Sequence, residues 1–104
     1  MNTEKNVKIA LHIGMQKTDI GWFDNEEVLL KVTKNSNTFD DLKFDTDWNW
    51  LLAVVSHLSS EHDRDNDKDF DAFCYNISDA VLNYDLERAY NNLVVLIKVL
   101  EAKK

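Results

Sequence analysis

The sequence has no proline and only two glycines, Gly14 and Gly21, among its 104 residues. Because these are the residues that most often interrupt helices, their scarcity favours a helix-rich fold. The single cysteine, Cys74, excludes an intramolecular disulfide bond. Residues 1–5 are polar, and no apolar segment of the length of a secretory signal follows them. We therefore expect a cytoplasmic protein in a reducing compartment.

Basic residues are also scarce. Twelve Lys and Arg oppose nineteen Asp and Glu, which gives a formal net charge of −7. Nucleic acids and anionic lipids select basic surfaces, so we expect neither a nucleic-acid-binding nor a membrane-binding protein. The longest apolar run, residues 93–97, is far shorter than the roughly 20 residues of a membrane span. Most often an acidic surface simply keeps a protein soluble. Otherwise it binds a basic partner or mimics a nucleic acid.

What remains is the composition of an ordinary globular chain, with 44% hydrophobic and 30% charged residues. At this length we expect a single domain over residues 1–104 with a sizeable core. The predicted fold class is α+β, in the order of an N-terminal helix, a β-hairpin and three helices.

In the N-terminal third, the residue patterns are compatible with more than one kind of element. Hydrophobic residues alternate over residues 7–15, which is the period of a strand, but Gly14 lies where a helix C-terminal glycine would lie. Aromatic and β-branched residues over 20–24 and 28–33, separated by a polar turn, predict a hairpin. Residues 34–41 are expected to form a loop.

A helix is predicted to open at Thr46 or Asp47, which are good N-caps, and to continue to about residue 60. At 100° per residue its apolar face collects Trp48, Leu51, Leu52, Val55 and Leu58. Trp50, Val54 and His57 fall along the margin of that face, and Ala53 lies opposite.

Two more helices are predicted over residues 69–83 and 85–102, after an acidic connector at 61–71. The last helix has a continuous apolar stripe, with acids at its start and lysines at its end. Val95 and Val99 lie beside that stripe, one turn apart. They are interpreted as isolated surface valines or, alternatively, as a homo-oligomer contact.

Four patterns together resemble a family of small uncharacterised proteins of bacteriophages and of Bacteroidetes-type genomes. They lie at residues 9–14, 44–55, 77–82 and 86–98, and the tryptophan pair Trp48-Asn49-Trp50 is the most specific part. Family members typically carry an I-A-x-F-M-G start, an S-W-D-W-L-M-P-V-V centre and an I-E-x-x-Y-x-A-V-V-E-F-I-K-W end. This chain has Asn49 where Asp is usual, Ala53 where Pro is usual and Val99 where Trp is usual.

The resemblance implies a phage-like accessory context and favours a helix over the first segment. It carries over no catalytic residue, because no activity is established for that family.

The acidic connector carries five aspartates at alternate positions, which are candidate partner-binding residues: Asp63, Asp65, Asp67, Asp69 and Asp71. The first three imitate the opening of a calcium-binding EF-hand loop. The imitation then fails, because Lys68 stands at the position of the obligatory glycine and Cys74 at that of the bidentate glutamate. We therefore expect a solvated acidic loop or a partner-facing patch, and no metal site.

Trp50 lies at the margin of the apolar helix face, and His57 follows seven residues later on nearly the same line. Together they could stack a ring-shaped ligand or anchor a partner, so both are candidate binding residues. The alternative, which is favoured, is a tryptophan that covers the edge of the core.

Catalytic constellations are not recognisable. Cys74 lies between Phe73 and Tyr75 and is interpreted as buried and inert, and the three histidines lack metal-ligand spacing. Two isolated glycines form no phosphate-binding loop. We expect no enzyme and no cofactor.

The leading hypothesis is a non-enzymatic interaction protein, phage-encoded and acting on a host or defence protein. The alternative is a protein that binds or sequesters a nucleotide-like small molecule.

Overall fold

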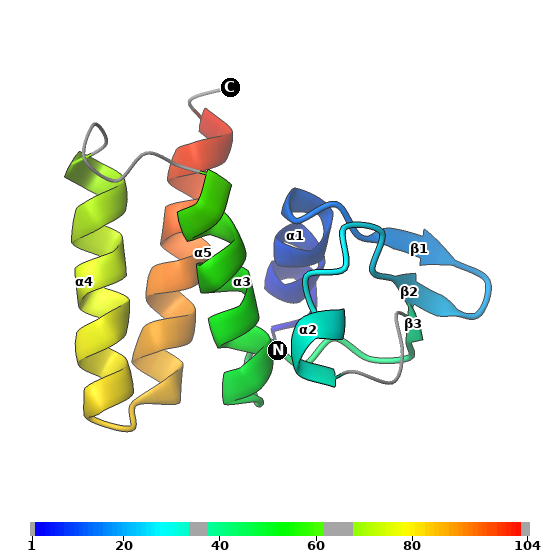
Figure 1. Ribbon diagram of the computed structural model, residues 1–104, viewed down its shortest axis with the longest axis horizontal. Helices are drawn as coiled ribbons and strands as arrows, with labels where there is room; N and C mark the ends of the chain where they lie inside the picture. The colour runs from blue at the N-terminus through cyan, green and yellow to red at the C-terminus, as the bar shows by residue number, and fades with distance from the viewer. Residues whose placement is uncertain (1, 34–37, 62–67, 103–104) are drawn as a thin grey trace. The chain divides into compact units, whose positions relative to one another are not determined.

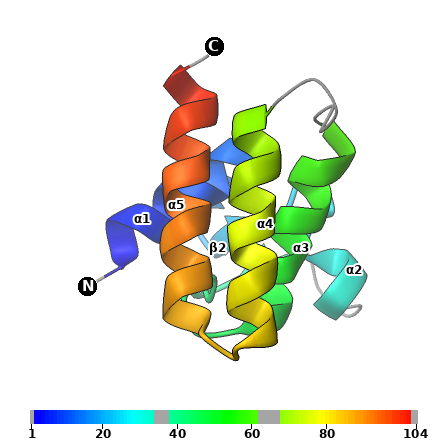
Figure 2. The same cartoon turned by 90° about the vertical axis from the view of Figure 1, so that its left-hand side faces the viewer.

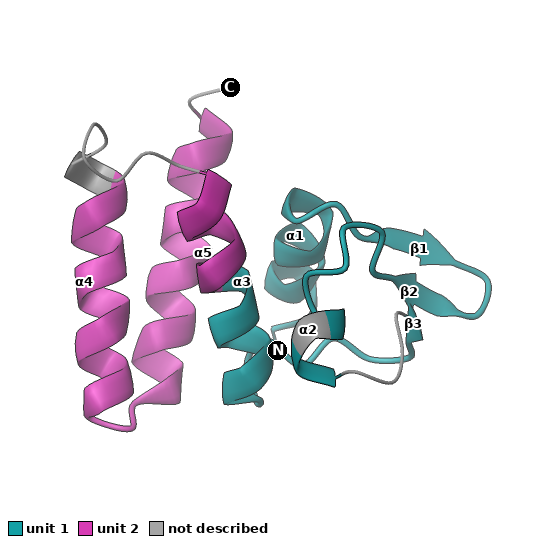
Figure 3. Cartoon of the chain, viewed as in Figure 1, with its two compact units in different colours: residues 1–54 teal, residues 55–104 magenta. Residues whose placement is uncertain are grey.

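The computed structural model describes residues 2–33, 38–61 and 68–102. The chain divides into two compact units, residues 1–54 and 55–104, and the boundary falls within helix α3 (Figure 3). The element order is a helix, a small antiparallel sheet and further helices (Figure 1), so the predicted α+β class and its N-terminal helix are confirmed.

Helix α1 spans Thr3–His12, and Gly14 explains why this segment is not a strand. Gly14 adopts φ +86°. Its N–H binds the carbonyl of Leu11 at 3.2 Å, and the N–H of Met15 binds that of Ala10 at 2.9 Å. This pair of bonds is the Schellman motif, which ends a helix at a left-handed residue. The strand-like alternation was misleading, since Leu11 is exposed while Ile9, Ala10 and Ile13 are buried.

Three short strands form the sheet: β1 (Gln16–Thr18), β2 (Gly21–Phe23) and β3 (Thr38–Phe39), in the order β1-β2-β3. Both pairings are antiparallel, and Trp22 lies opposite Lys17 on one side and Phe39 on the other. Gly21 permits the close approach of β3. It has φ +134°, and an added Cβ would lie 2.5 Å from the carbonyl oxygen of Phe39.

The predicted hairpin partner over 28–33 is wrong. Its last four residues form the short helix α2 (Leu30–Thr33), and the true hairpin pairs β1 with β2. The cause is Asp24, whose side chain is 1% exposed. The carboxylate accepts the backbone N–H groups of Val28, Leu29 and Leu30 at 3.0, 2.8 and 3.0 Å. These bonds bend the chain into a helical turn, because they occupy donors that a strand would use.

Helix α3 spans Trp48–Glu61 and begins after Asp47, as predicted. The Asp47 carboxylate accepts the N–H of Asn49 at 2.8 Å, which is an N-cap interaction. Its buried face differs from the predicted one. The buried residues are Trp50, Leu51, Ala53, Val54 and Leu58, whereas Trp48 and Val55 are only half-buried and Leu52 is 39% exposed.

In the second unit, helices α4 (Lys68–Leu82) and α5 (Leu86–Ala102) lie side by side and antiparallel (Figure 2). Both agree with the predicted ranges to within one residue. The apolar stripe of α5 is buried as expected: Ala89, Tyr90, Leu93, Val94, Leu96, Ile97 and Leu100. None of the described helices is long and apolar enough to cross a membrane.

Candidate binding site

A cavity of about 510 Å³ opens in the first unit. The start of α1 supplies one wall, β2 supplies a second and the segment after β3 supplies the third. The lining residues are Asn2, Thr3, Asn6, Val7, Trp22, Asp40, Asp41, Leu42 and Asp45. All the charged side chains in this lining are aspartates, so the cavity is an acidic one.

Asp45 is fixed in place by two asparagines of α1. Asn2 donates to one carboxylate oxygen at 3.0 Å, and the buried Asn6 donates to the other at 3.1 Å. Asn6 also donates to the carbonyl of Leu42 at 3.3 Å. Burial alone would raise the pKa of Asp45, but the hydrogen bonds from Asn2, Asn6 and the backbone outweigh it. The pKa therefore lies below its ordinary value, and the group stays ionised.

Asp40 and Asp41 are exposed at the rim. Within the described ranges of the chain, no Lys, Arg or His lies within ion-pair distance of either carboxylate. Their charges are therefore available to a group from outside. Ionised carboxylates accept charge-assisted hydrogen bonds from an ammonium or a guanidinium group.

Trp22 is the aromatic wall of the cavity, and only 8% of it is exposed. The ammonium nitrogen of Lys17, its cross-strand neighbour, lies 5.6 Å from the ring centroid. That distance is typical of a cation–π interaction, so the Trp22 ring already has a cation of this chain as its partner.

Trp50, a predicted binding residue, is buried in the core of the first unit with 5% exposure. Its ring meets Phe39 and Phe44 edge to face, at centroid distances of 4.9 and 5.2 Å. This is the alternative that the sequence favoured, a tryptophan in the core. Because these neighbours and the rest of the core leave so little of Trp50 exposed, its ring is not accessible to a stacked ligand.

His57, the other member of that predicted pair, lies in the second unit and is half-buried. Its Nε2 is 3.2 Å from a carboxylate oxygen of Glu61, one turn later on α3. The contact is an ordinary helix-surface pair.

The acidic connector is only partly described. Asp63, Asp65 and Asp67 lie outside the described residues, whereas the later positions of the calcium-loop imitation, Lys68 and Cys74, belong to helix α4. Asp69 belongs to the first turn of α4, and Asp71 is exposed on the same helix. Among the described residues, no group of three His, Cys, Asp or Glu side chains could hold a metal ion. Cys74 is buried, as predicted.

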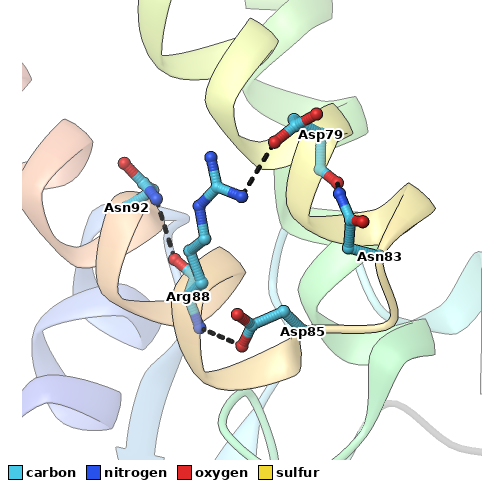
Figure 4. Close-up of polar contacts among 5 residues, drawn as sticks. All are labelled: Asp79, Asn83, Asp85, Arg88 and Asn92. Atoms are coloured by element: carbon cyan, nitrogen blue, oxygen red, sulfur yellow. Dashed lines mark hydrogen bonds and ion pairs between the residues drawn. The ribbon is translucent and has the colours of Figure 1, made fainter.

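A second cavity, of about 410 Å³, lies on α5 and is lined by Asp85, Glu87, Arg88, Asn91, Asn92 and Val95. Figure 4 shows the polar contacts beside it. The guanidinium of Arg88 donates to Asp79 at 2.8 Å, and the N–H of Arg88 donates to Asp85 at 3.1 Å (Figure 4). The first bond joins α5 to α4, and the second caps the start of α5.

Sequence reasoning missed the acidic cavity of the first unit. Its walls come from residues 2–7, 22 and 40–45, which are distant in the sequence. The available signal was three aspartates within residues 40–45, close to a predicted loop. Comparison with protein-family models, with curated proteins and with solved structures found no match to this chain.

Proposed function

We propose that this protein acts without catalysis, as a binding protein whose acidic cavity in the first unit receives a basic side chain of a protein partner. The observation that carries the proposal is the lining of that cavity, in which every charge is a carboxylate. A lysine or arginine that enters exchanges water for charge-assisted hydrogen bonds, which are the stronger class.

The geometry favours arginine over lysine. Asp45 is held rigid by Asn2 and Asn6, so its orientation is set before a partner arrives. A planar guanidinium can meet carboxylates with two parallel N–H groups in a fixed geometry, whereas an ammonium group is a compact point charge without that geometry.

A nucleotide-like ligand fits this cavity poorly, because a phosphate would lie against carboxylates. The cavity on α5 is no better, since Arg88, the one base in its lining, is already bonded to Asp79. The resemblance to phage proteins suggests the class of partner, a host or defence protein of a bacterium that exposes a basic segment.

Calorimetric titration with a short arginine-containing peptide tests the proposal. The comparison ligand is the same peptide with citrulline, which has the shape of arginine without its charge. We expect the wild type to bind the arginine peptide with measurable heat and the citrulline peptide at least about tenfold more weakly.

The double variant Asp40→Asn/Asp41→Asn should lose most of that affinity. A matched control, Glu4→Gln/Asp19→Asn, removes two exposed carboxylates of the same unit that do not line the cavity. Equal losses in both double variants would mean that only net charge matters, and that the cavity is not the site.

A further inference from the structure

The acidic cavity of the first unit presents its carboxylates in two different environments. Asp45 is half-buried, and its carboxylate is held by Asn2 and Asn6 at 3.0 and 3.1 Å. Asp40 and Asp41 belong to the same segment of the chain but are exposed at the rim. The cavity therefore offers one fixed carboxylate and, separately, a pair of solvated ones.

These three carboxylates do not converge on one point. Among the residues that the structure describes, no three His, Cys, Asp or Glu side chains are placed to hold a metal ion, and these include the three aspartates of the lining. A single cation thus leaves part of the negative charge of the cavity unbalanced. Two cations on one ligand match the arrangement better, one beside Asp45 and the other at the rim.

The lysines on the surrounding elements do not supply these cations. Lys5 and Lys8 on α1 and Lys43 in the segment after β3 are exposed and lie outside the lining. Within the described parts of the chain, none of them forms an ion pair with an aspartate of the cavity. The ammonium nitrogen of Lys17 lies over the ring of Trp22 instead, 5.6 Å from the centroid. The charge of the cavity is therefore left for a ligand.

The cavity is also larger than one basic side chain requires. Its volume of about 510 Å³ falls within the range of roughly 300–1,000 Å³ that is typical of sites for drug-sized ligands. Val7 and Leu42 add apolar surface to the lining. Lysine and arginine bury their methylene stems on such surface while their charged ends remain at polar groups. Two neighbouring basic side chains therefore suit both the size and the lining.

From these observations we propose that the cavity binds two adjacent basic residues of one partner segment, an arginine at Asp45 and a second arginine or lysine at Asp40 and Asp41. This inference rests on the function proposed above, and it names the sequence that the partner must expose. Once the first residue is bound, the second is held at a high effective concentration. It therefore adds affinity without a second association event.

Calorimetric titration with three capped peptides tests the inference. One peptide carries Arg-Arg at its centre, and the other two carry Arg-citrulline and citrulline-Arg, so that only the number of charges changes. We expect the wild type to bind the Arg-Arg peptide at least about tenfold more tightly than either single-arginine peptide. A cavity that takes only one arginine would give a statistical gain of about twofold.

Variants show whether that gain arises in the cavity. Asp45→Asn and Asp40→Asn/Asp41→Asn each remove one of the two places for a cation, so the gain should fall to about twofold in each. Glu4→Gln/Asp19→Asn changes the net charge by as much as the double variant at the rim but leaves the lining intact. It should retain the gain of about tenfold. Circular dichroism confirms that each variant folds.

The outcomes distinguish this inference from the proposed function. A wild type that binds none of the three peptides would contradict both. Binding of the single-arginine peptides without a further gain from the second arginine would overturn the inference and leave the proposed function standing. The inference would also be overturned by a gain that survives Asp45→Asn, by a gain lost in Glu4→Gln/Asp19→Asn, or by free spermidine that binds as tightly as the Arg-Arg peptide.

Discussion

The first unit depends on a few residues in special backbone settings, whereas the second depends on a long apolar stripe. Gly14 ends α1, Gly21 lets β3 approach β2, and the buried Asp24 holds the turn that begins α2. In α5, by contrast, seven buried residues share the contact with neighbouring elements. Stability should therefore be concentrated at single positions in the first unit and distributed in the second.

Gly21→Ala is expected to have the largest effect. A Cβ at this position would lie 2.5 Å from a backbone oxygen of β3, which cannot move aside as a side chain can. We expect a loss of roughly 3 kcal/mol in the free energy of unfolding, measured by urea denaturation. Gly14→Ala is the control and should cost less, because its Cβ would meet the flexible side chain of Glu26. Equal costs would contradict the steric explanation.

Asp24→Ala should come next. It leaves three backbone N–H groups around Val28 to Leu30 without their acceptor, two of them in buried bonds, and we expect a loss of about 2 to 3 kcal/mol. Asp47→Ala, which removes an exposed cap of α3, should cost about 1 kcal/mol in the same assay. If the two variants proved equally stable, burial of the Asp24 carboxylate would not be what matters.

Tyr84→Gly should change stability in the opposite direction. Tyr84 occupies the left-handed position of the Schellman motif that ends α4, with φ +55°, and its side chain is 89% exposed. Glycine adopts this conformation without a penalty, so thermal unfolding should show a gain of about 1 kcal/mol. Tyr84→Ala removes the same ring but retains the strain. A gain in that control would show that the ring, and not the backbone, is unfavourable.

The smallest effect should be a pH dependence from Asp45. Because its folded pKa lies below its ordinary value, its contribution is fully present above the unfolded pKa of about 3.9. The contribution is lost as the pH falls through the lower folded value. Asp45→Asn should therefore flatten the loss of stability below about pH 4, measured by urea unfolding at a series of pH values. A variant that follows the wild-type curve over that range would mean that Asp45 is not held by Asn2 and Asn6.

The helices were predictable where one apolar stripe dominated, as in α4 and α5. Helix α3 was found, but its buried face was not, because nearly every residue from Trp48 to Val55 is apolar. Such a run fits several faces, and only tertiary packing selects Trp50 over Trp48. The hairpin was misplaced because the three bonds accepted by Asp24 outweigh the β-branched composition of the following residues.

The candidate site could not be predicted from the sequence, for a different reason. The cavity exists only because α1, β2 and the segment after β3 converge, and no local pattern encodes that convergence. The predicted sites drew on local patterns, a tryptophan near a histidine and a run of aspartates. Of these residues, Trp50 has a structural role that its aromatic neighbours explain.

The most direct test of the proposed function is an NMR titration that reports on the walls of the acidic cavity. The signals to follow are the indole N–H of Trp22 and the side-chain amide of Asn6, during addition of the arginine peptide and then of its citrulline counterpart. We predict that the arginine peptide shifts both signals in a saturable manner and that the citrulline peptide leaves them in place. Equal shifts with both peptides, or shifts confined to residues outside the cavity, would contradict the account.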